Sequence, residues 1–239
     1  KAQSSKGMAE GRDPHRLGLS PRSVRPYLAM GHLYACQRDF ASAEAFYQRA
    51  RSVDRRSVET LIALGNYYRL VDRLEEAEQA YREARRLRPS QVDLHILLGD
   101  LHTFSGKGAE GIKDYLEALR LKPQSGLLKR KLSEAYLSMG RPDRALPYLK
   151  EILEEEPGNA EVRLLLGKAY LAKDEVGPAI GEFQRIVAEY PTYAQGRYHL
   201  ELAYLARRNL PLAKREFPEA VRLNPGLSQA RLAPGRSLL

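Results

Sequence analysis

The feature that most constrains this sequence is a repeat with a constant period of about 34 residues. Gly65 follows Gly31 by this interval and precedes Gly99 by the same interval. A proline recurs at the same spacing, at Pro89, Pro123, Pro157, Pro191 and Pro225. A fixed period in this range is typical of solenoids, whose units bury their apolar faces only by stacking on their neighbours. The sequence therefore predicts a solenoid.

Within the unit Val58–Gln91, apolar residues recur every three or four positions in two runs, which places each run on one helix face. The runs are Leu61, Leu64 and Tyr68, then Ala77, Tyr81, Ala84 and Leu87. Residues 71–74 leave room only for a tight turn between them. Pro89 cannot continue the second helix because it lacks an amide hydrogen. Each unit is therefore predicted to be two antiparallel helices, A and then B, with Ser57 as the N-cap of helix A.

Residue size indicates where the two helices meet. Gly65 and Ala77 carry little or no side chain, so we expect helices A and B to approach closely there. Tyr68 and Tyr81 are large, and we expect them to fill the space between neighbouring units.

This pattern resembles the tetratricopeptide repeat family. The residues that carry the resemblance are Leu61, Leu64, Gly65, Tyr68, Ala77, Tyr81, Ala84 and Pro89. The resemblance implies an all-α fold, a right-handed α-α superhelix of antiparallel helix pairs. It covers residues 24–227 as six repeats without insertion or deletion, namely 24–57, 58–91, 92–125, 126–159, 160–193 and 194–227.

The two ends of the chain lack the pattern. Residues 1–23 are rich in Gly, Ser, Arg and Pro and are expected to form a flexible basic tail or linker. Residues 228–239 are expected to be an incomplete seventh repeat or a poor cap. The formal charge is +9, but the repeats contribute only +4 of it, which makes nucleic acid an unlikely partner.

Repeat 6 departs from the pattern at two positions. Glu201 occupies the place of the close-contact glycine, where it should push the helices apart or be squeezed outward. Pro218 lies within helix B, where it should kink or interrupt the helix.

The sequence does not determine the cellular compartment of the protein. Cys36 is the only cysteine, which excludes an intrachain disulfide and fits a reducing compartment without requiring one. No apolar run approaches the ~20 residues of a transmembrane helix. The chain begins with Lys1 and not with methionine, so a missing N-terminus stays open. The regular, Arg-, Leu- and Ala-rich repeats suggest a bacterial protein, either cytoplasmic or associated with the cell envelope.

No catalytic, metal or cofactor pattern is found in the sequence. His95 and His102 share a helix face, but both occupy consensus core places, which favours packing over metal binding. Cys36 has no flanking charge pattern and is expected to be inert. The sequence therefore predicts a chain that is not an enzyme and holds no cofactor.

With no catalytic or metal site predicted, the function is expected to depend on the surface of the solenoid. In the family that the chain resembles, the A helices line a groove for peptides or partner helices, mainly through places two, five, nine, twelve and thirteen of each repeat. The candidate groove residues here are Leu28, His32, Ile62, Asn66, Arg69, Ile96, Asp100, Phe104, Arg130, Glu134, Leu164, Lys168 and Tyr198. The subclass that grips a chaperone's terminal carboxylate is rejected, since only Asn66 matches its pattern and Asp100 would repel a carboxylate.

Two functions are carried forward. The first is a protein-interaction scaffold that holds a peptide or protein partner in the groove, as part of a larger assembly. The second is a building block that self-associates end to end through an unfinished seventh repeat. RNA binding through the basic surface is a weaker alternative.

Overall fold

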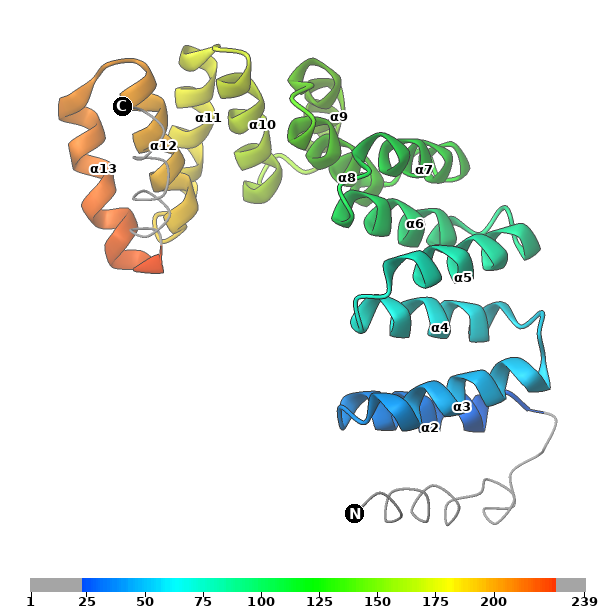
Figure 1. Ribbon diagram of the computed structural model, residues 1–239. Helices are drawn as coiled ribbons and strands as arrows, with labels where there is room; N and C mark the ends of the chain where they lie inside the picture. Colours follow the sequence, from blue (N-terminus) through cyan, green and yellow to red (C-terminus); the bar gives the residue numbers. More distant parts are fainter. Residues whose placement is uncertain (1–22, 227–239) are drawn as a thin grey trace. The chain divides into compact units, whose positions relative to one another are not determined.

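The computed structural model describes residues 23–226, and this part of the chain consists of helices joined by short turns, without strands (Figure 1). These residues divide into two compact units, with the boundary between residues 122 and 123. The first contains α2 (Arg25–Cys36), α3 (Phe40–Val53), α4 (Val58–Leu70), α5 (Leu74–Leu87), α6 (Val92–Phe104) and α7 (Gly108–Leu121). The second contains α8 (Gly126–Ser138), α9 (Pro142–Glu155), α10 (Ala160–Ala172), α11 (Val176–Glu189), α12 (Ala194–Ala206) and α13 (Leu210–Leu223). The predicted all-α fold of consecutive helix pairs is confirmed.

Several helix starts follow the capping chemistry of the sequence. The Ser57 hydroxyl accepts a hydrogen bond from the Thr60 amide at 3.2 Å, which confirms it as the N-cap of α4. Asn159 caps α10 in the same way, through the Val162 amide at 3.1 Å. Each cap satisfies an amide that has no partner inside its helix.

The turn inside each helix pair contains one residue in the left-handed backbone region. These residues are Arg38, Asp72, Gly106, Gly140, Asp174 and Arg208, all with φ between 60° and 76° and each at the same place of its repeat. Only two of the six are glycine, although residues with a Cβ adopt this conformation at a cost of about 1–2 kcal/mol. The packing of the helix pair therefore imposes the turn conformation on whichever residue occupies the place.

The glycine of helix A makes room for an aromatic ring of helix B in the same pair. A Cβ added to Gly65 would lie 2.3 Å from the Tyr81 ring, and one on Gly99 would lie 2.5 Å from Tyr115. The Tyr81 ring therefore packs against helix A of its own pair, because only glycine leaves space for it there. It also belongs to a core cluster that includes Leu98 and Leu101 of the next pair, as expected of a residue between units. Tyr68 does reach the preceding pair, where its hydroxyl accepts a hydrogen bond from Gln48 at 2.8 Å.

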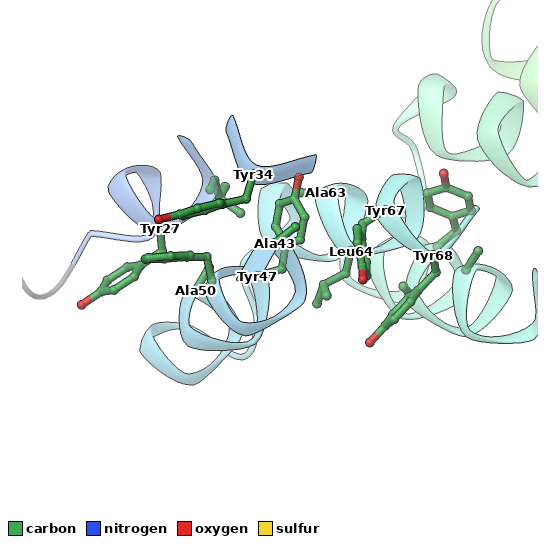
Figure 2. Packing of buried hydrophobic residues seen from close by; sticks show 14 of the residues in the cluster. Tyr27, Tyr34, Ala43, Tyr47, Ala50, Ala63, Leu64, Tyr67 and Tyr68 are labelled. Atoms are coloured by element: carbon green, nitrogen blue, oxygen red, sulfur yellow. The ribbon is translucent and has the colours of Figure 1, made fainter. Parts of the chain in front are cut away.

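Tyrosines dominate the core of the first unit. Figure 2 shows side chains from α2, α3 and α4 gathered around small residues such as Ala43. The Tyr34 and Phe46 rings stack at 5.4 Å, and those of Tyr47 and Tyr67 lie 5.3 Å apart. Burying an aromatic side chain contributes roughly 2–3 kcal/mol, so the first contact stabilises the pair α2–α3 and the second stabilises its packing against α4.

The core of the second unit is more aliphatic, and its last pair excludes one of the two outcomes expected at Glu201 and at Pro218. Glu201 is only 1% exposed, so it is not squeezed outward. Helix α13 continues through Pro218, and α9 likewise contains Pro147. In α13, the packing of the buried Ala213 and Ala220 outweighs the hydrogen bond that the proline cannot donate.

Candidate functional site

The candidate groove residues of the first unit lie on α2, α4 and α6 with different exposure. Leu28 is 4% exposed and belongs to the core, so it does not line an accessible surface. Ile62, Asn66, Ile96 and Asp100 are half-buried, whereas His32, Arg69 and Phe104 are exposed. The structure therefore places seven of these eight residues where a partner could reach them.

Two large apolar side chains stand out on these helices. Phe104, at the end of α6, is 71% exposed, and Leu70, at the end of α4, is 60% exposed. They occupy the same place in consecutive repeats, and in the preceding repeat that place is taken by the exposed Cys36. Exposed apolar side chains gathered at equivalent places are typical of interaction surfaces.

Tyrosine hydroxyls from the B helices hold a row of polar side chains on the A helices. The Tyr81 hydroxyl donates to Asn66 Oδ1 at 2.7 Å, and Tyr115 donates to Asp100 Oδ1 at 2.5 Å. Tyr47 and His32 Nδ1 form the equivalent hydrogen bond at 3.0 Å. We call His32, Asn66 and Asp100 the polar row. These hydrogen bonds hold each side chain in one orientation, so its other polar atoms are positioned to bind a partner.

Tyr47 and Tyr81 stay protonated over the physiological range, so each hydroxyl keeps a hydrogen to donate. Burial raises the pKa of the Tyr47 hydroxyl to about 12, with a further contribution from Cys36. Burial also raises the pKa of Tyr81, although the nearby Arg69 opposes this shift. The place of Arg69 beside Tyr81 connects this candidate residue to the polar row.

The candidate residues of the second unit are arranged differently. Arg130 contacts Glu134 at 3.3 Å and Glu161 at 3.5 Å, so its charge is already matched. Leu164 is 8% exposed and packs in the core. Lys168 is exposed, and Tyr198 is half-buried.

No tyrosine holds the equivalent polar places of the second unit. Leu149 and Phe183 occupy the places of Tyr81 in the two repeats that contain Glu134 and Lys168. Because these side chains carry no hydroxyl, they cannot orient a polar side chain on helix A. The hydroxyl-held row therefore belongs to the first unit.

His95 and His102 are buried, as the sequence predicted, and both also have polar partners. His95 is 7% exposed, and its Nε2 contacts the Pro89 carbonyl oxygen at 2.8 Å. Arg197 makes the corresponding contact with the Pro191 carbonyl at 3.0 Å, so this place links a repeat to the end of the one before it. Sequence reasoning missed this link, which requires the packed geometry of two repeats.

His102 lies between two carboxylates from different helices. Its Nδ1 is 2.7 Å from Asp114 Oδ2, and its Nε2 is 3.3 Å from Glu78 Oε1. Lys107 and Arg85 contact the same two carboxylates at 2.8 and 2.7 Å. Burial alone would raise the pKa of Glu78, but Lys107 and His102 hold it below its ordinary value. The cluster connects α5 to α6 and α7.

The acidic, cysteine and histidine residues at 23–226 form no group of three that could hold a metal ion. None of the helices in this range combines the length and the apolar composition that a membrane crossing needs.

Consecutive antiparallel helix pairs of equal length, in several of which a glycine of helix A contacts an aromatic ring of helix B, define a helical-repeat protein. Sequence comparison gives the family: models of the tetratricopeptide repeat match residues 28–91, 62–126 and 136–200. The chain belongs to the tetratricopeptide repeat family. No curated protein sequence matches it.

Solved structures agree with this fold. A tetratricopeptide repeat protein from Parabacteroides merdae has a TM-score of 0.74 at 16% identity, covering 89% of this chain and 88% of that one. YrrB, described as a protein with an unusual peptide-binding site, has a TM-score of 0.61 at 22% identity, covering 79% and 97%. PilF of Pseudomonas aeruginosa has a TM-score of 0.64 at 18% identity, covering 85% and 92%. At these identities the likeness concerns the fold alone.

Proposed function

We propose that this protein is an interaction scaffold whose first unit binds a peptide segment of a partner protein across α2, α4 and α6. The observation that carries the proposal is the juxtaposition, on these helices, of the exposed Leu70 and Phe104 with the polar row. Apolar anchors flanked by oriented polar groups suit an extended or helical segment. The family fold, and the peptide-binding site in the description of YrrB, support this class of partner.

We expect a few apolar anchor residues, and not the whole groove, to provide most of the binding free energy. A small number of buried apolar side chains usually provide most of the affinity of a peptide interface. Leu70 and Phe104 have the most apolar surface to lose on these helices, whereas Leu28 is already buried. The bound segment should therefore place its own apolar side chains against Leu70 and Phe104, with its polar groups facing the polar row.

The test is a selection of peptides from a random displayed library against the whole protein, followed by affinity measurement on variants. Replacing Leu70→Ala together with Phe104→Ala should weaken the selected peptides by about tenfold or more. The matched control is Leu127→Ala with Leu210→Ala, which removes leucines that are 48% and 57% exposed in the second unit. Equal binding by both double variants would refute the proposal.

End-to-end self-association remains an alternative prediction. It depends on residues 228–239, which lie outside the described residues, and no contact at 23–226 bears on it. Light scattering over a wide concentration range tests it directly: a mass that rises with concentration would favour a building block over a scaffold that acts as a monomer.

A further inference from the structure

The B helices of the first unit present an arginine-rich surface that the peptide proposal does not use. Two shallow cavities of about 470 Å³ lie along α3 and α5 and share Glu83. One is lined by Gln48, Arg51, Ser52, Arg55 and Glu83, and the other by Gln79, Arg82, Glu83, Arg86 and Leu87. We call Arg51, Arg55, Arg82 and Arg86 the arginine surface.

The residues of this surface follow helical spacing. On α3, Gln48, Arg51 and Ser52 are three and four positions apart, and the residues on α5 have the same spacing, so each set lies on one face of its helix. Arg55 lies in the turn that follows α3, two residues after its last residue Val53. Arg86 lies one repeat period after Ser52, at the same place of the next repeat. The two cavities are thus a continuous feature of consecutive B helices.

Half of the arginine surface is unpaired. Arg51 contacts Glu83 at 2.9 Å, and Arg82 contacts Glu78 at 2.5 Å. Arg55 and Arg86 are exposed and make no ion pair with any residue at 23–226. Arg51 and Arg82 are thus engaged by carboxylates, which leaves the charges of Arg55 and Arg86 for a partner.

The ion pair between Arg51 and Glu83 indicates which chemical group the arginine surface can bind. A carboxylate from one helix already meets a guanidinium from the neighbouring helix there, in a hydrogen bond at 2.9 Å. Guanidinium groups bind carboxylates through paired N–H donors. Arg55 and Arg86 have the same donors free, one in each cavity.

The cavities lack what a nucleic acid would need. Single strands bind by stacking bases on aromatic side chains, and neither cavity is lined by one. The tyrosines of the same helices, Tyr47 and Tyr81, are 2% and 0% exposed. Gln48, Gln79 and Glu83 lie between the arginines, which suits an acidic protein segment better than a uniform phosphate backbone.

We propose that the arginine surface binds an acidic segment of a protein, with its glutamate or aspartate carboxylates on Arg55 and Arg86. This site is separate from the peptide surface of the A helices, since its residues lie on α3, in the turn that follows it and on α5, while the peptide surface lies on α2, α4 and α6. One chain would thereby hold two segments, one with apolar anchors and one acidic.

The experiment uses the full chain and a fluorescein-labelled polyglutamate peptide, with binding followed by anisotropy at physiological salt. Arg55→Gln with Arg86→Gln removes both unpaired charges without breaking an ion pair, and should weaken binding roughly tenfold. The control is Arg144→Gln with Arg207→Gln, which removes two exposed charges of the second unit and should change affinity by less than about twofold.

Three results would overturn the proposal. The first is no binding of polyglutamate to the unmodified chain. The second is equal weakening by both double variants, which would reveal attraction by net charge alone. The third is tighter binding of a labelled single-stranded RNA of equal length that depends on Arg55 and Arg86, which would assign the surface to nucleic acid.

Discussion

The Tyr81 hydroxyl donates a hydrogen bond to Asn66 Oδ1 at 2.7 Å, from helix α5 to helix α4 of the same pair. The ring reaches this position because Gly65 leaves the space beside it, where an added Cβ would lie 2.3 Å away. One glycine thus allows both the packing of the pair and the orientation of a surface amide. The same arrangement recurs with Tyr115 and Asp100.

Removing the hydroxyl tests this relationship. Tyr81→Phe should lower the free energy of unfolding by about 1 kcal/mol, since the ring stays but Asn66 loses its donor. Urea denaturation measures the change. Tyr148→Phe is the control, because that half-buried hydroxyl makes no hydrogen bond among the described residues, and we expect almost no effect. A loss at Tyr148 as large as that at Tyr81 would show that the hydrogen bond is not the cause.

Gly65→Ala separates helix propensity from packing. Alanine favours a helix over glycine by about 1 kcal/mol. At Gly65, however, the new methyl would overlap the Tyr81 ring, so we expect a net destabilisation of about 1–3 kcal/mol. Gly181→Ala in α11 is the matched control, because nothing lies within 4 Å of its added Cβ and the protein should become slightly more stable. Thermal or urea unfolding of both variants gives the comparison, and a stabilised Gly65→Ala would refute the close approach.

In the left-handed turns, introducing a glycine should stabilise the fold, and removing a glycine should destabilise it. Arg38 has φ 60°, and Arg38→Gly should stabilise the protein by up to about 1 kcal/mol by removing backbone strain. Gly106 has φ 76° with open space around it, so Gly106→Ala should destabilise by a similar amount through strain alone. Chemical denaturation of both variants measures the change in the free energy of unfolding. Effects of the same sign would mean that strain does not govern these turns.

His199 predicts a pH dependence. Burial lowers the pKa of its imidazole below the ordinary 6.5, and the charge of Lys168 lowers it further. Because the folded chain binds this proton more weakly than the unfolded chain, stability is full above pH 6.5 and falls as the pH drops through the folded pKa. Two-dimensional NMR should show His199 titrating below 6.5.

Lys168→Gln provides the control for this assignment. It should move the titration of His199 upward but leave it below 6.5, because burial is the larger cause. A titration at or above the ordinary value in the unmodified protein would contradict the prediction.

The sequence was sufficient for the features that repeat and insufficient for those that depend on packing. The period, the cap at Ser57 and the burial of His95 follow from residue types at fixed places. The sequence did not separate Leu28 and Leu164, which face the core, from the half-buried Ile62 at the same place. Such differences depend on the neighbouring pair, which local spacing does not describe.

The left-handed residues and the tyrosine bonds were missed for a related reason. Asp72 and Arg208 do not by themselves signal φ near 60°, although they share their place in the repeat with Gly106 and Gly140, which was a usable sign. The bond from Tyr81 to Asn66 requires the distance between helices A and B, which only the folded pair defines.

The hydroxyls that hold the polar row also restrict which sequences this surface can adopt. A buried tyrosine hydroxyl that donates needs an acceptor, and Asn66 and Asp100 both offer an oxygen. A lysine at such a place offers no acceptor, so the hydroxyl hydrogen of the tyrosine would lose its partner. In the second unit, Lys168 is found in the repeat where Phe183 replaces the tyrosine. The two places should therefore change together during evolution, with the ring of helix B deciding which charges helix A can display.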